Sequence, residues 1–341
     1  MRHSVWVGGG LTLLAGLGSG NCMFPMKFAR RWKWENLWLV FSLVSLVVIP
    51  WILAFCYVSK LWSVYSAIGL GTMVLPLLLG AGWGIAQILF GLSVARLGLA
   101  LGYAIIIGLG SLGGTLIPLL VNSRSVLGTS VGALFFAGLA VMITGIVVSA
   151  RAGSQRERGT THTAGGNYAG ALGLAVVCGL MAPMINYAFA FGQAIADRAV
   201  ELGSSPTEAA FAVWPLALAG GLVPNIGYSL YLLSKNGTWG LYREVTWHDG
   251  ALATLMGLLW MGAVGIYGVA SVFLGSLGTS VGWGLFQIFM IITANLSGLL
   301  TGEWRSAPAT SRKLLYAGLG LLIAATLLLA ATVRLIGENA R

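Results

Sequence analysis

Large polar side chains inside long apolar runs are the residues of this sequence that could do chemistry. They are amides: Asn21, Gln87, Asn186, Asn225, Gln287 and Asn295. Water is absent from the hydrocarbon of a membrane, so a polar group placed there needs a partner or a function. Two interpretations stay open for each amide. It forms a hydrogen bond between helices, worth about 1 kcal/mol, or it lines a cavity that binds a polar ligand.

Aromatic side chains accompany the amides: Trp83, Tyr103, Tyr187, Tyr228, Trp260, Tyr267 and Trp283. A neutral sugar offers hydroxyl groups to amides and flat C–H faces to rings. The mixture therefore predicts a small neutral sugar as ligand. Other tryptophans, Trp38 among them, lie near the ends of apolar runs and are interpreted as anchors at the membrane interface.

None of the nine acidic residues lies at the centre of an apolar run. Asp249 and Glu303 come nearest, each at the end of a run, where partial burial would favour the protonated form. These two carboxyl groups are the proton-coupling candidates. The alternative is structural: Glu303 pairs with Arg305 or Arg312 at the membrane surface, and Asp249 caps its helix.

Other classes of chemistry lack their motifs. Cys22, Cys56 and Cys178 lie in apolar runs without metal-ligand spacing, which predicts neither a metal site nor disulfides. No constellation typical of a soluble enzyme appears, so neither an enzyme nor a cofactor is expected. The sequence has no phosphate-binding loop of the Walker type, which argues against an ATP-driven pump. The net charge of +10 resides in short connectors between apolar runs, which favours anionic lipid headgroups over nucleic acid as the partner.

Apolar runs dominate the elements that must position these residues. The chain is 57% hydrophobic and 8% charged, against about 25% charged residues in soluble domains. About 20 apolar residues cross a bilayer as a helix. Ten such spans are predicted, which makes this an all-α membrane protein: 4–24, 37–59, 73–95, 100–121, 130–149, 168–192, 209–233, 250–273, 280–302 and 313–336.

The two halves of the chain repeat weakly. Trp83 and Gly91 recur at the same spacing as Trp260 and Gly268, and an Ala-Gly-Leu triplet at 137–139 recurs at 317–319. We expect a first five-helix repeat over 1–150, a polar linker over 151–167 and a second repeat over 168–341. An odd number of spans inverts the second repeat, which is the plan of many secondary transporters.

Charge bias predicts the orientation. The odd-numbered loops carry thirteen of the 19 lysines and arginines. Because short basic loops face the cytoplasm, both termini are expected outside.

Several motifs are specific. The segment from Lys27 to Trp38 is basic and then reads W-x-W-E-x-x-W from Trp32. It resembles the signature of the L-rhamnose–proton symporter family. Further motifs similar to that family are Gly80-Ala81-Gly82-Trp83-Gly84-Ile85, Asn225-x-Gly227-Tyr228 and Glu303-Trp304. The resemblance runs from about residue 5 to 336.

The resemblance implies the drug/metabolite transporter superfamily, with ten helices in two inverted repeats and a cavity lined by all spans but the fifth and tenth. It also implies uptake of L-rhamnose or a related deoxy sugar with a proton, by alternating access, across a bacterial inner membrane. The chain departs from the family pattern at Gln87, at Leu89 and over 182–193. An exporter or uniporter of another metabolite therefore remains an alternative, and so does a sugar receptor without transport. The oligomeric state is not predicted.

Overall fold

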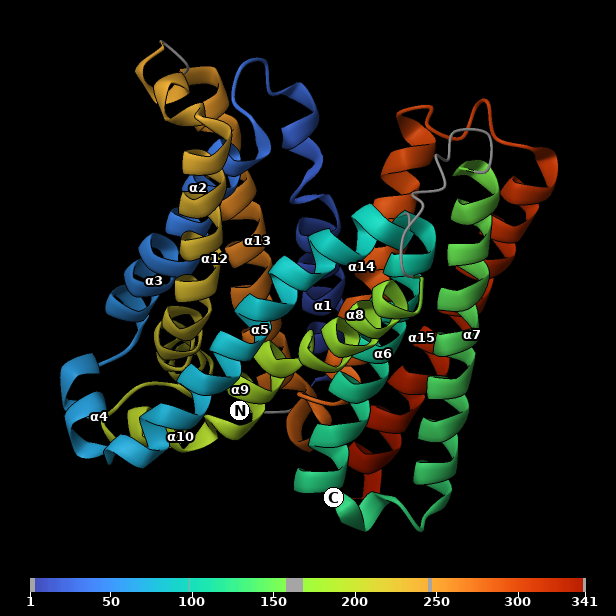
Figure 1. Ribbon diagram of the computed structural model, residues 1–341. Helices are drawn as coiled ribbons and strands as arrows, with labels where there is room; N and C mark the ends of the chain where they lie inside the picture. The colour runs from blue at the N-terminus through green and yellow to red at the C-terminus, as the bar shows by residue number, and fades with distance from the viewer. Residues whose placement is uncertain (1–3, 98, 158–167, 245–246, 340–341) are drawn as a thin grey trace. The chain divides into compact units, whose positions relative to one another are not determined.

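A computed structural model describes residues 4–97, 99–157, 168–244 and 247–339, and every regular element in these ranges is helical (Figure 1). The α-helices are α1 (Val5–Asn21), α2 (Trp34–Leu43), α3 (Ile49–Tyr57), α4 (Leu61–Ala67), α5 (Leu70–Leu97), α6 (Leu99–Asn122), α7 (Ser130–Glu157), α8 (Tyr168–Met181), α9 (Met184–Phe191), α10 (Gln193–Glu201), α11 (Pro206–Ala209), α12 (Trp214–Asn236), α13 (Trp247–Leu274), α14 (Val281–Leu300) and α15 (Ala309–Asn339). Short 3-10 turns are η1 (Phe24–Phe28), η3 (Arg124–Val126), η4 (Ala210–Ala212), η5 (Thr238–Arg243) and η6 (Gly275–Leu277), and η2 (Val44–Val48) is a π-helical turn.

Nine helical segments of the described residues are at least 18 residues long and apolar enough to cross a membrane. They correspond to nine of the ten predicted spans. The remaining one, α1, has 17 residues and measures about 26 Å at about 1.5 Å per residue, a little less than the hydrocarbon thickness of about 30 Å. Nine spans are thus confirmed by length and composition, and the tenth stays a prediction.

The predicted sixth span, 168–192, is two helices rather than one. Helix α8 ends at Met181 and α9 begins at Met184. Pro183 explains the break, because proline disfavours the helical conformation of the residue before it and has no N–H to donate. Of the predicted linker, residues 151–157 continue α7 as a helix, and residues 158–167 lie outside the described residues.

The chain forms two compact units, and each draws on both halves of the sequence. Unit 1 contains residues 1–16, 89–183 and 270–341. Unit 2 contains residues 17–88 and 184–269. The chain passes between the units inside α1, α5 and α13, and at the break between α8 and α9.

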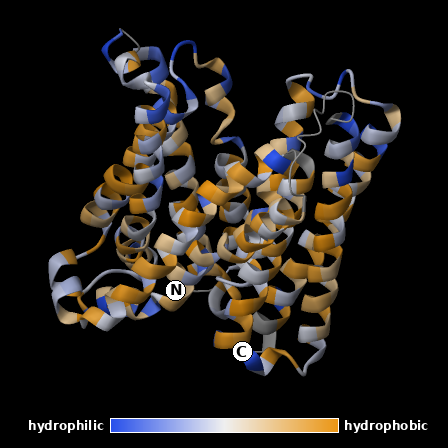
Figure 2. Ribbon diagram, in the orientation of Figure 1, coloured by the Kyte–Doolittle hydropathy of each residue, from blue (hydrophilic) through white to orange (hydrophobic). Residues whose placement is uncertain are grey.

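Helices α7 and α15 pack along their length in unit 1 (Figure 1). Glycines allow this close approach, since a Cβ built on Gly145 would lie 3.0 Å from Leu322, and one on Gly138 would lie 3.0 Å from Leu329. Figure 2 shows both helices as mainly hydrophobic along their bodies. The buried core of unit 1 includes Leu119, Phe135, Met142, Ile288, Leu322 and Leu329.

Helix α12 packs against α2, α3 and α9 in unit 2. Small residues again set the distance between helices. A Cβ on Gly80 of α5 would overlap the carbonyl oxygen of Ala217 on α12, and one on Gly84 would lie 2.6 Å from the oxygen of Gly221. The GxxxG spacing of Gly80 and Gly84 therefore serves helix packing, as in other membrane proteins.

Candidate functional site

The carboxylate of Asp249 anchors the basic loop before α2. Asp249 lies in the first turn of α13 and is 1% exposed. It accepts backbone hydrogen bonds from Arg30 at 3.0 Å, Arg31 at 2.8 Å and Trp32 at 2.9 Å. The imidazole Nδ1 of His248 lies 3.1 Å from its Oδ1. Three N–H donors stabilise the ionised carboxylate strongly.

The W-x-W-E segment also forms hydrogen bonds with the end of α12 and with η5. Asn236 and Thr238 donate side-chain hydrogen bonds to Glu35 Oε1 at 3.0 and 2.8 Å. Asn36 donates to the Thr238 carbonyl oxygen at 3.1 Å. Burial raises the pKa of Tyr242 to about 12, so its hydroxyl stays protonated and donates to the Asn36 carbonyl oxygen at 3.0 Å. The W-x-W-E-x-x-W segment is therefore attached to the ends of α12 and α13.

The amide of Asn225 has two partners inside unit 2. Its Oδ1 accepts a hydrogen bond from Trp38 Nε1 at 3.0 Å, and its Nδ2 donates to the Gly221 carbonyl oxygen at 2.8 Å. Trp38 is thus hydrogen-bonded to α12, and the interfacial role expected for it stays a prediction. The indole also stacks on Trp34, with ring centroids 4.8 Å apart.

Trp83 and Trp260 are brought together by the fold. Their rings stack at 5.2 Å with an interplanar angle of 19°. Phe41 meets Trp260 edge-on at 6.2 Å, and Gly221 lies against the Trp83 ring, where a Cβ would be 2.9 Å away. Trp83 is buried and Trp260 half-buried, so Phe41, Trp83 and Trp260 form an aromatic wall in unit 2.

Asn186 lies in a second aromatic cluster of unit 2. Tyr267 donates its hydroxyl to Asn186 Oδ1 at 2.6 Å. The Phe189 ring stacks on Trp214 at 4.6 Å and lies 6.1 Å from Tyr267. Trp214 Nε1 is buried and has no hydrogen-bond partner among the described residues. A buried donor left unpaired costs about 1–3 kcal/mol.

Unit 1 holds Trp283 and Gln287 on successive turns of α14, facing α6. Trp283 Nε1 donates to the Gly110 carbonyl oxygen at 3.3 Å, and Gln287 Nε2 donates to Ser111 Oγ at 3.4 Å. A Cβ on Gly114 would overlap the Trp283 indole. Both side chains are more than 90% buried, and both of these hydrogen bonds are longer than usual.

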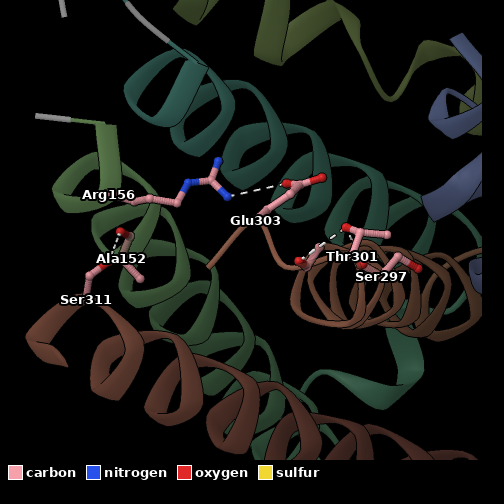
Figure 3. Close-up of polar contacts among 7 residues, drawn as sticks. Ala152, Arg156, Ser297, Thr301, Glu303 and Ser311 are labelled. Carbon is pink, nitrogen blue, oxygen red and sulfur yellow. Dashed lines mark hydrogen bonds and ion pairs between the residues drawn. The ribbon is translucent and has the colours of Figure 1, made fainter. Parts of the chain in front are cut away.

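Glu303 forms an ion pair with Arg156, whereas the structural alternative drawn from the sequence named Arg305 and Arg312. Helix α14 ends at Leu300 and is followed by Gly302 at φ +80°, and Glu303 N–H donates to the Gly298 carbonyl oxygen at 2.9 Å. This is the glycine cap that commonly ends a helix. Arg156 of α7 reaches Glu303 Oε2 at 3.5 Å (Figure 3) and lies 4.7 Å from the centroid of the Trp304 ring.

Close to this pair, Ser311 Oγ of α15 donates to the Ala152 carbonyl oxygen of α7 at 2.6 Å (Figure 3). The Glu303 side chain is 35% exposed and that of Arg156 is 24% exposed. The ion pair therefore retains contact with solvent, which screens it.

The remaining predicted site residues also lie in unit 2. Asn21 ends α1 and donates to the Leu17 carbonyl oxygen at 2.9 Å. Gln87 is half-buried on α5. Tyr187 is 7% exposed on α9 and stacks on Phe191 at 6.0 Å.

Sequence reasoning did not single out Trp214 or Arg156 as site residues. Trp214 lies at the start of its helix, where a tryptophan resembles an interfacial anchor. Arg156 lies in a polar stretch that was expected to be a linker. No sequence pattern marks either residue as part of a site. Each is recognised only by its contacts with residues that are distant in the sequence.

Taken together, the described helices define a multi-pass helical membrane protein. The model of the L-rhamnose-proton symport protein family matches residues 1–337, so the chain belongs to that family. The family comprises proton-coupled sugar symporters, which are transporters rather than enzymes.

Curated relatives agree with this assignment. The L-rhamnose-proton symporters of Escherichia coli strain K12 / DH10B and of Shigella boydii serotype 4 strain Sb227 are each 28% identical to this chain over 304 residues. Each alignment covers 86% of this chain and 88% of the relative.

Proposed function

We propose that this protein takes up L-rhamnose or a related deoxy sugar together with a proton, by alternating access, in a bacterial inner membrane. The observation that carries the proposal is the match to the symporter family over residues 1–337. The comparisons do not favour an exporter of another metabolite. Ten spans in two inverted repeats, 1–150 and 168–341, with both termini outside, complete the proposal.

The sugar is bound by amides and rings. Gln87, Asn186 and Gln287 hydrogen-bond to hydroxyl groups, and the aromatic wall presents Trp83 and Trp260 to the C–H faces of the ring. The weak bond of Gln287 to Ser111, at 3.4 Å, is easily exchanged for one to a ligand. Further candidates for contact are Asn21, Tyr187, Asn225 and Trp283.

Glu303 is the better of the two candidates for the proton carrier. A carrier must be protonated in one state and ionised in another, so its carboxylate must be released from its partners. Release of the Asp249 carboxylate would leave three backbone N–H groups without that acceptor. Release of the Glu303 carboxylate would leave the guanidinium of Arg156, now 3.5 Å away. That guanidinium is partly exposed, so water can solvate it.

Uptake into proteoliposomes tests the proposal. Purified protein with radiolabelled L-rhamnose outside and an imposed inward pH gradient should accumulate sugar above the external concentration. A protonophore should abolish accumulation but leave counterflow intact. Protein-free liposomes are the control. The proposal fails if neither uptake nor counterflow is seen with L-rhamnose or with other deoxyhexoses and pentoses.

A further inference from the structure

Trp214 carries a hydrogen-bond donor that the surrounding helices do not use. The side chain is 1% exposed, and its Nε1–H has no acceptor among the described residues. Indole nitrogen is a donor only, so it cannot be satisfied by accepting a bond. Phenylalanine would fill much of the same volume and stack on Phe189 without leaving a polar atom unpaired. A buried unsatisfied donor is rare in folded proteins and calls for an explanation.

The edge of the indole that carries Nε1 faces α13 where α13 has no side chain. A Cβ built on Gly268 would lie 3.1 Å from Nε1 and 3.4 Å from Cζ2 of Trp214. The residue before Gly268 is Tyr267, which donates to Asn186. Phe189 packs against both the indole and the Tyr267 ring, and we name Asn186, Phe189, Trp214 and Tyr267 the Trp214 cluster.

The chemistry of the cluster selects a neutral ligand. Its polar atoms are an indole N–H, a phenol and an amide, and none of its members is charged. An anionic ligand would require a cation, since a lone charge in such an environment is strongly disfavoured. A polyol supplies hydroxyl oxygens as acceptors and C–H faces that stack on indole.

Phe189 covers the indole in this conformation, with the two rings 4.6 Å apart and 4° from parallel. Phe189 belongs to α9, a helix of eight residues that begins after the break at Pro183 and is followed by Gly192. A short helix between two such points can shift independently of its neighbours. A Cβ on Gly268 would meet Phe189 Cζ at 3.5 Å as well as Trp214 Nε1, so displacement of α9 would expose the indole face and open space beside the N–H.

We infer that Trp214 is a specificity-determining residue of this transporter, whose Nε1–H donates to one hydroxyl oxygen of the sugar once Phe189 withdraws. The inference rests on the proposed function, and it adds Trp214, which is not among the sugar-binding residues proposed there. A hydrogen bond to a ring hydroxyl would distinguish sugars that present that hydroxyl from those that lack it, because a site built to pair with a hydroxyl rejects the analogue without it.

The test compares wild-type protein with Trp214→Phe in detergent. Equilibrium binding is measured for L-rhamnose and for its monodeoxy analogues, each lacking one hydroxyl, and Tm is measured for each protein. We expect Trp214→Phe to bind L-rhamnose about tenfold more weakly, the effect of about one hydrogen bond, with Tm unchanged or raised. One monodeoxy analogue should bind poorly to the wild type, and the variant should not discriminate against it.

Two further variants complete the experiment. Trp62→Phe is the control, because Trp62 is 65% exposed on α4, and it should bind as the wild type does. Gly268→Ala keeps the indole but places a methyl group against Nε1. It should reproduce the loss of affinity, and it decides the question if Trp214→Phe does not fold.

The outcomes separate the two hypotheses. If the wild type binds L-rhamnose and both Trp214→Phe and Gly268→Ala bind it equally well, the role of Trp214 is overturned and the proposed function stands. If the wild type binds none of these sugars, the proposed function and this inference both fail.

Discussion

Asp249 at the start of α13 accepts a hydrogen bond at 2.9 Å from the backbone N–H of Trp32, 217 residues earlier in the chain. The same carboxylate holds the two preceding N–H groups. The tryptophan of a sequence signature is thus positioned through its backbone, and the residue that positions it lies far away in the sequence.

Replacement of this acceptor tests its structural role. In Asp249→Asn the charge is lost and one of the two oxygens becomes a donor, so at least one N–H loses its acceptor. Hydrogen bonds to charged groups are worth about 1.5–3 kcal/mol. We expect a loss of about 2 kcal/mol in stability, seen as a lower Tm in detergent.

Glu244→Gln is the matched control for that variant. Glu244 pairs with Arg31 at 2.7 Å, but both side chains are well exposed, and surface pairs contribute about 0–1 kcal/mol. Equal losses of Tm in Glu244→Gln and Asp249→Asn would contradict the anchoring role of Asp249.

Glu303→Gln tests proton coupling. Glutamine cannot exchange a proton, so this variant should retain L-rhamnose counterflow but lose accumulation driven by a pH gradient. Glu201→Gln is the control, since Glu201 is another surface carboxylate paired with an arginine, Arg198, at 2.6 Å. Accumulation by Glu303→Gln with the pH dependence of the wild type would exclude Glu303 as the carrier.

The bond between Trp38 and Asn225 predicts an energetic coupling. In a double-mutant cycle of Trp38→Phe and Asn225→Leu, the two substitutions should be less than additive. The expected coupling energy is about 1 kcal/mol, the usual value for a hydrogen bond between membrane helices. Thermal unfolding in detergent measures it. Strict additivity would show that the two side chains do not interact in the folded protein.

Two glycines on α5 should respond oppositely to alanine. A Cβ on Gly80 would overlap the backbone of Ala217, whereas a Cβ on Gly91 meets nothing within 4 Å. Gly80→Ala should therefore destabilise unit 2 by about 3 kcal/mol or more, because backbone must move. Gly91→Ala should be neutral or stabilising by up to about 1 kcal/mol, the difference in helix propensity. Similar Tm values for the two variants would refute this account of α5 packing.

Much of the fold is predictable from hydropathy. Nine of ten expected spans correspond to long apolar helices, because an apolar run in a membrane has to satisfy its backbone internally. The break at Pro183 was missed, although proline is its cause, because hydropathy continues unchanged across it. The count of ten depends on α1, whose 17 residues are one fewer than the 18 required of a membrane-spanning helix here.

The candidate site was less predictable. The sequence indicated which amides and rings lie in apolar runs, but not which of them meet. The structural alternative for Glu303 named arginines nearby in the chain, and in the structure Glu303 pairs with Arg156 on another helix. Trp214 has an unpaired N–H only because of how α12 and α13 pack around it, which no local pattern encodes.

By itself, the sequence determined the class of protein, the approximate spans and the family, because these depend on hydropathy and on motifs that are local in the chain. Only the tertiary structure decided the partners: Asp249 with the loop at residues 30–32, Asn225 with Trp38, Trp83 with Trp260, and the isolation of the Trp214 donor. The physical reason is the separation in sequence over which each interaction acts. Helix formation needs neighbours within four residues, whereas a buried hydrogen bond or ring contact needs two distant segments placed within a few ångströms of each other.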